Sequence, residues 1–161
     1  MVFFDVIIHA ITENIDKICV TENFEWLFKI KCTLCYKDQP NEISLSEVKQ
    51  FETEKQKSLT NFIMKCKDCK NMMTITVYEK SAKRLNCEGG NDEGVFASFE
   101  CRGCEITSWN PCEGVFVESL EGTVFSDVDI RVEGWSDWDE KAKVFCTLTS
   151  LQHKIEKSKD L

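Results

Sequence analysis

The feature that most constrains this chain is a pair of Cys-x-x-Cys motifs, Cys32/Cys35 and Cys66/Cys69, separated by 30 residues. A turn of this spacing brings two sulfur atoms to about 4 Å from each other, and two such turns complete a tetrahedral ligand set for zinc. An apolar residue stands two positions before each motif, which indicates a strand running into each turn. We therefore predict one zinc ion per chain, held by Cys32, Cys35, Cys66 and Cys69.

A closed site of four cysteines stabilises a fold and leaves no coordination position for water or substrate. Lysines near the motifs would offset the negative charge of a zinc–thiolate centre and favour thiolate over thiol. These lysines are Lys31, Lys37, Lys65, Lys67 and Lys70. The alternative interpretations are four buried free cysteines or a redox pair.

The cysteine content indicates a reducing compartment. The chain has ten cysteines, but the paired spacing favours metal-bound thiols over disulfides. The apolar N-terminus is interrupted by Asp5 and His9 and has no basic residue before it, so it is expected to be a strand and not a signal peptide. No apolar run is long enough for a transmembrane helix, so no membrane is expected as a partner. We expect a cytoplasmic protein, with the nucleus as a second location.

Charge is distributed unevenly along the chain, whose formal net charge is −8. Residues 29–70 hold nine lysines against six acidic residues, a net charge of +3. Residues 88–140 hold 14 acidic residues against two arginines, a net charge of −12. An acidic field over this half repels phosphate groups, so we expect no nucleic-acid partner.

Alternation of apolar and polar residues with a period of two dominates the chain and predicts an all-β fold. We expect two small antiparallel β lobes packed together as one sandwich-like compact unit. The N-terminal lobe, residues 1–86, would hold the zinc knuckles, and the C-terminal lobe would span residues 95–153. An acidic, glycine-rich loop at 87–94 would connect them. We expect a strand at residues 122–132. Residues 46–57 could form a helical turn or a solvated loop, and we favour the loop.

A third Cys-x-x-Cys motif, Cys101/Cys104, has Cys112 nearby and is open to several interpretations. It could be a redox dithiol, part of a second metal site, or a set of structural cysteines. Glu100 and Glu105 flank the pair and should raise the pKa of its thiols, whereas an oxidoreductase lowers that pKa. We favour structural cysteines and keep a thiol oxidoreductase or metal-handling protein acting through Cys101/Cys104 as the alternative.

Carboxylates also gather around Trp135 and Trp138. Paired carboxylates can act as general acid and base or bind a hard cation, but no calcium-loop spacing occurs here. Ser136 followed by Asp139 resembles the cap and first turn of a short helix. We assign this cluster a structural or solvated role.

Histidine occurs only at His9 and His153, and each lies in an expected strand. No local pattern pairs either of them with a nucleophile, and the usual hydrolase motifs do not occur. We therefore expect two strand histidines with structural partners, and a protein that is not an enzyme.

Several motifs together resemble the eukaryotic CXXC-motif-containing zinc-binding protein family over nearly the whole chain. Besides the two ligand pairs, they comprise Thr12–Ile15, Trp26, Glu100–Gly103, Asn110–Pro111, Gly122–Ile130 and Trp135–Lys141. The resemblance implies a small all-β protein with one structural zinc on the four cysteines and no established catalytic activity. Cys104 and Cys112 depart from the family pattern, which keeps the cysteine matching Cys101.

These observations together favour a binding function over catalysis. The metal site is closed, no catalytic constellation is recognised, and the surface charge is polarised. We expect a zinc-stabilised β scaffold that acts as a protein-interaction module, with another protein as its partner.

Overall fold

The computed structural model describes residues 1–53 and 58–159. Every element of regular secondary structure in these residues is a β-strand, which confirms the all-β class. No helix long and apolar enough to cross a membrane occurs among them. The loop expected at 46–57 lies partly outside the described residues, and its described part contains the two-residue strand β5.

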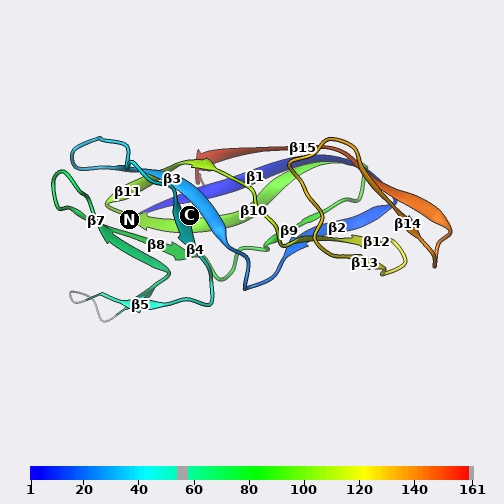
Figure 1. The fold of residues 1–161 in the computed structure, drawn as a ribbon, viewed down its shortest axis with the longest axis horizontal. Helices are drawn as coiled ribbons and strands as arrows, with labels where there is room; N and C mark the ends of the chain where they lie inside the picture. Colours follow the sequence, from blue (N-terminus) through cyan, green and yellow to red (C-terminus); the bar gives the residue numbers. More distant parts are fainter. Residues whose placement is uncertain (54–57, 160–161) are drawn as a thin grey trace.

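The largest sheet has six strands in the order β14-β15-β1-β10-β8-β7. All of its pairings are antiparallel, and β1, β10 and β15 lie side by side along the length of the molecule (Figure 1). The bounds are β1 Val2–Glu13, β7 Phe62–Lys65, β8 Met72–Val77, β10 Asn91–Arg102, β14 Trp135–Asp139 and β15 Val144–Lys157.

Three smaller sheets complete the described part of the fold. One has the order β11-β3-β4, the second β13-β12-β2-β9, and the third is the hairpin β5-β6. Their bounds are β2 Ile15–Val20, β3 Trp26–Cys32, β4 Ile43–Leu45, β5 Phe51–Glu52, β6 Leu59–Thr60, β9 Arg84–Asn86, β11 Cys104–Trp109, β12 Val115–Ser119 and β13 Val124–Phe125.

Alternation along the strands places the core between the sheets. In β1, Val6, Ile8 and Ala10 are buried while the residues between them are partly exposed, as a period of two requires. Trp26 on β3 is the centre of an aromatic cluster and contacts Phe99 of β10 with ring centroids 5.1 Å apart. Because Trp26 lies on one sheet and Phe99 on another, this cluster packs the two sheets together.

The strand pairing differs from the expected division at 87–94. Residues 91–94 form the start of β10, and β10 pairs along most of its length with β1. Val2 faces Cys101 and Ile11 faces Asn91 in that register. The largest sheet therefore contains strands from both expected halves. Apolar strands such as β1 and β10 pair with each other across a long stretch of sequence, and not only with their neighbours in the chain.

Two local expectations for the C-terminal part were wrong. Residues 122–132 contain only the short strand β13, and the helix expected from Ser136 is the strand β14. In β14 the backbone pairs with β15, with Trp138 opposite Phe145. The aromatic pair, whose ring centroids are 5.0 Å apart, favours the strand over the helical turn that Ser136 and Asp139 suggested.

Candidate metal centre

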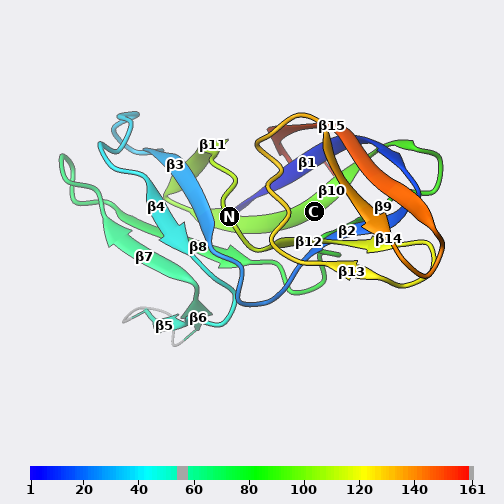
Figure 2. The same cartoon turned by 45° about the vertical axis from the view of Figure 1, so that its right-hand side comes forward.

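The two Cys-x-x-Cys motifs form equivalent turns at one end of the molecule (Figures 1 and 2). Cys32 is the last residue of β3, in the three-stranded sheet. Cys66 directly follows β7, and the chain returns as β8 of the six-stranded sheet. A metal bound by both motifs would therefore join the ends of two different sheets.

The same backbone hydrogen bonds close both turns. In the first, the Cys32 N–H donates to Lys37 O at 3.0 Å and the Tyr36 N–H donates to Cys32 O at 3.0 Å. In the second, the Cys66 N–H donates to Asn71 O at 2.8 Å and the Lys70 N–H donates to Cys66 O at 3.0 Å. Because the offsets are identical, each motif presents its two sulfurs in the same way.

The residue that follows each motif adopts a left-handed backbone conformation. Tyr36 has φ of 62° and Lys70 has φ of 65°. This conformation is uncommon for residues with a Cβ and costs about 1–2 kcal/mol. It reverses the chain so that the next N–H, that of Lys37 or Asn71, points at the sulfur of the second cysteine of the motif.

The four sulfurs fit a zinc ion. All Sγ atoms of Cys32, Cys35, Cys66 and Cys69 lie within 4.8 Å of one another. The Cys32–Cys69 Sγ distance is 3.6 Å and the Cys35–Cys66 Sγ distance is 3.7 Å. A tetrahedron with zinc–sulfur bonds of about 2.3 Å has sulfur–sulfur edges of about 3.8 Å. Small adjustments of the side chains would thus complete the tetrahedron.

The first cysteine of each pair is the more acidic. Burial raises the pKa of the Cys32 thiol, but the N–H groups of Cys35 and Leu34 donate to its sulfur, and with a side-chain amide they hold this pKa below its ordinary value. The Cys69 N–H is the largest influence on Cys66 and outweighs burial, so that the pKa of Cys66 falls to about 6. These hydrogen bonds therefore favour the thiolate of both cysteines, the form that binds zinc.

The second cysteine of each pair is less acidic. The Lys37 N–H acts to lower the pKa of Cys35, yet burial and the neighbouring cysteines raise it to about 12. For Cys69 the Asn71 N–H acts in the same direction, while burial and the Cys32 sulfur raise its pKa. The protons on these two thiols would leave when zinc binds.

Two side-chain amides extend the site beyond its ligands. The buried Gln39 donates through Nε2 to the Cys66 Sγ at 3.4 Å. Asn71 donates through Nδ2 to the Cys32 Sγ at 3.6 Å. Donors of this kind spread the negative charge of a thiolate and orient it toward the metal. Sequence reasoning missed both residues, because a polar residue near a Cys-x-x-Cys motif is not distinctive.

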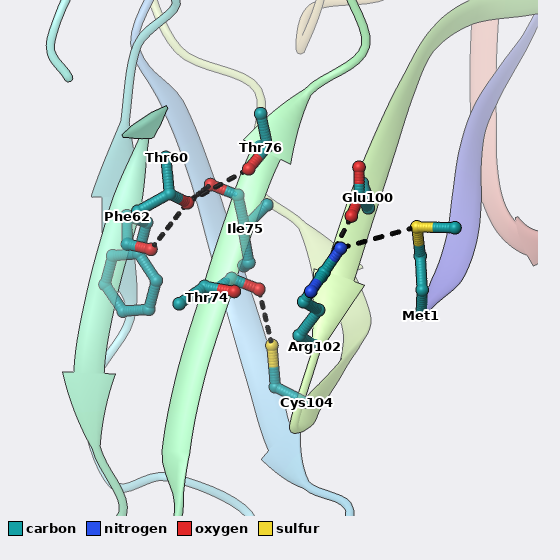
Figure 3. A network of polar contacts seen from close by, with 9 residues as sticks. All are labelled: Met1, Thr60, Phe62, Thr74, Ile75, Thr76, Glu100, Arg102 and Cys104. Carbon is teal, nitrogen blue, oxygen red and sulfur yellow. Dashed lines mark hydrogen bonds and ion pairs between the residues drawn. The ribbon is translucent and has the colours of Figure 1, made fainter. Parts of the chain in front are cut away.

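The third motif lies beside the site but outside the ligand cluster. In residues 1–53 and 58–159, the four cysteines named above are the one group of three or more metal-ligating side chains close enough to share an ion. Cys101 and Cys104 are both buried. Figure 3 shows Cys104 on the strand after the β10–β11 turn, directed at the Thr74 carbonyl of β8, with its Sγ 3.8 Å from that oxygen.

The Cys101 thiol is held in its protonated form. Its pKa lies well above the ordinary value, first because of the hydrogen bond with Cys104, then because of burial and the charges of Glu100 and Glu105. The direction agrees with the prediction from the two glutamates, but the thiol partner and burial act more strongly. A buried, protonated thiol such as that of Cys101 is a poor nucleophile.

The remaining candidate residues have structural partners. His9 Nε2 contacts Asn91 Oδ1, and His153 Nε2 lies 3.1 Å from Trp109 O. In the carboxylate cluster, Asp139 is fully buried and accepts a hydrogen bond from Thr123 Oγ1 at 2.6 Å. This hydrogen bond joins the motif Gly122–Ile130 to the motif Trp135–Lys141. The other cysteines, Cys19, Cys87 and Cys146, are buried as expected, and Cys112 donates to Glu25 O at 3.1 Å.

The fold and the four-cysteine cluster define a small all-β protein of the zinc-binding class. Comparison of sequences gives the family: the chain belongs to the CXXC motif containing zinc binding proteins of eukaryotes, whose family model matches residues 5–156. This confirms the resemblance seen in the sequence motifs.

Individual relatives span nearly the same length. The Bos taurus CXXC motif containing zinc binding protein is 29% identical over 150 residues, covering 92% of this chain and 94% of the relative. UPF0587 protein CG4646 of Drosophila melanogaster is 33% identical over 141 residues, covering 83% and 84% of the two chains. The crystal structure of C1orf123 superposes with a TM-score of 0.89 at 26% identity, over 97% of this chain and 99% of that one.

Proposed function

We propose that Cys32, Cys35, Cys66 and Cys69 bind one structural zinc ion per chain, and that the zinc-stabilised protein is a non-catalytic scaffold for protein interaction in the cytosol. The observation that carries the metal proposal is the convergence of four sulfurs within 4.8 Å at the junction of two sheets. Four protein ligands leave no open position for a substrate, so the ion would contribute stability and not chemistry.

The scaffold role is supported by the distribution of charge and by the third motif. Residues 29–70 carry a net charge of +3 and residues 88–140 carry −12, and charges of this density steer association with a protein of complementary charge. The buried Cys101/Cys104 dithiol, with the pKa of Cys101 raised, offers no support for thiol oxidoreductase activity.

The proposal is tested by comparing zinc-loaded protein with protein treated with a chelator. The loaded, affinity-tagged protein should capture a cytosolic protein that also binds it when both are purified, and removal of zinc should weaken that binding. Turnover of insulin disulfides by the loaded protein would instead favour the oxidoreductase. Retention of four alkylation-resistant thiols after the chelator has removed all metal would contradict the ligand assignment.

A further inference from the structure

The Gly103 carbonyl lies where all three Cys-x-x-Cys motifs meet. Gly103 occupies the turn between β10 and β11, which passes from the six-stranded to the three-stranded sheet. Its oxygen accepts a hydrogen bond from the Thr33 N–H at 3.1 Å, and Thr33 lies in the turn of Cys32/Cys35, the first zinc turn. It also accepts one from Asn71 Nδ2 at 3.2 Å, and Asn71 closes the second zinc turn.

Asn71 connects these three motifs through separate atoms. Its backbone oxygen accepts the Cys66 N–H at 2.8 Å. Its side-chain Nδ2 donates both to Gly103 O at 3.2 Å and to the Cys32 Sγ at 3.6 Å. One residue therefore contacts the first cysteine of each ligand pair and the turn of the third motif.

The side chain at the equivalent position in the first turn contacts neither Gly103 nor a ligand sulfur. Lys37 accepts the Cys32 N–H through its backbone oxygen, as Asn71 does for Cys66. The Lys37 side chain, however, is exposed, and its Nζ lies 3.9 Å from Oδ1 of Asp68 in the second turn. The amide on this side of the site belongs instead to Gln39, two residues after Lys37. Its Nε2 donates to the Cys66 Sγ and to Lys37 O, both at 3.4 Å.

We propose that Asn71 is a positioning residue of the metal centre, and that the turn of the third Cys-x-x-Cys motif holds Asn71 so that its amide orients Cys32. This inference rests on the proposed zinc site. The motif at Cys101/Cys104 thereby has a role in metal binding without supplying a ligand: its glycine carbonyl fixes the amide that contacts the ligand. Loss of a group that orients a ligand typically weakens metal binding 10- to 100-fold.

Gln39 provides the matched control, because it makes the same kind of amide-to-sulfur hydrogen bond without contacting Gly103. We would measure zinc affinity by chelator competition, the thiolate charge-transfer spectrum of the cobalt-substituted protein, and hydrogen exchange at the Thr33 amide. Gln39→Ala and Asn71→Ala should each weaken zinc binding about 10-fold or more and shift the cobalt spectrum. Only Asn71→Ala should also accelerate exchange at Thr33, by up to about 10-fold, because the Gly103 carbonyl that accepts the Thr33 N–H loses its second hydrogen bond and its turn is held less firmly.

Asn71→Asp preserves the shape of the side chain and replaces the donor by an oxygen facing both a thiolate and the Gly103 carbonyl. It should weaken zinc binding at least as much as Asn71→Ala, and it serves as the test if the alanine variant does not fold. Zinc affinity equal to wild type in either variant that folds, or Thr33 exchange no faster in it than in Gln39→Ala, would overturn the role of Asn71. Failure of the wild-type protein to bind cobalt through four thiolates would instead refute the proposed site.

Discussion

Replacing Gly103 by alanine should destabilise the protein more than its surface-turn location suggests. A Cβ on Gly103 would lie 2.2 Å from Met72 O and 3.0 Å from Asn71 Nδ2. The first distance is about 1 Å inside ordinary van der Waals contact, so the turn between β10 and β11 would have to move away from β8. Gly103 also has φ of +74°, a conformation that alanine adopts only at a cost.

The magnitude follows from three contributions. The left-handed backbone costs an alanine about 1–2 kcal/mol. Overpacking against backbone that does not yield readily costs about 1–3 kcal/mol. Movement of the turn weakens the hydrogen bonds from Thr33 and Asn71, each worth about 0.5–1.5 kcal/mol. A total near 4 kcal/mol would lower the Tm of a chain of this size by about 12 °C.

Gly134→Ala is the control, because Gly134 has φ of +81° and nothing lies within 4 Å of its added Cβ. It bears the backbone cost alone and should lower the Tm by about 4 °C. Both variants would be melted with zinc bound, followed by circular dichroism. A difference of less than about 2 °C between the Tm values of Gly103→Ala and Gly134→Ala would mean that the close approach to Met72 has no energetic consequence. That result would refute the reasoning.

Three further predictions concern other parts of the molecule. The Thr123 hydroxyl and further donors outweigh burial and hold the pKa of Asp139 below its ordinary value of 3.8. The ionised Asp139 therefore stabilises the fold above pH 3.8, and this contribution is lost as the pH falls through the lowered pKa. Asp139→Asn should therefore lower the Tm at pH 7 by roughly 5 °C, and the difference from wild type should shrink as the pH falls through the lowered pKa; a difference that does not change with pH would contradict this. Tyr36→Gly should be tolerated at φ of 62°, whereas Tyr36→Val should lower the Tm by about 5 °C; equal melting of the two would exclude a backbone effect. Cys104→Ser should retain zinc in metal analysis, because no ligand is lost; release of zinc would show that Cys104 is a ligand.

The parts of the fold that the sequence predicts are those determined over short distances. The period-two alternation of β1 and β3 follows from residues that stand next to one another, and the spacing in Cys32/Cys35 fixes a turn within four residues. The cluster of four sulfurs needed only the further assumption that two such turns meet. For the same reason, burial of Cys19 and Cys146 followed from residue type alone.

The pairing of distant strands could not be obtained in this way. β10 reads as the start of a second lobe, yet it pairs with β1 about 90 residues away in sequence, because both present apolar residues at matching intervals. Ser136 and Asp139 resemble a helix cap, but the apolar faces of Trp135 and Trp138 find partners across β13 and β15. Tertiary packing outweighs local preference in such segments.

The hydrogen-bonding groups around the metal centre were also outside the reach of sequence reasoning. Asn71 and Gly103 come from different motifs and acquire a role only because their turns touch. Nothing in the residue type of Asn71 distinguishes it from other polar residues that directly precede a strand. The glycine in Cys101-Arg102-Gly103-Cys104 is explained by its φ of +74° and by the neighbouring Met72 carbonyl, neither of which can be read from the motif.

The most direct test of the central claim is the zinc content of the native protein measured alongside that of Cys66→Ser. The account predicts one zinc per wild-type chain, four thiols that resist alkylation until chelator is added, and loss of zinc in Cys66→Ser, because three thiolates leave an incomplete ligand set. Two zinc ions per chain, or zinc retained at full occupancy by Cys66→Ser, would contradict it.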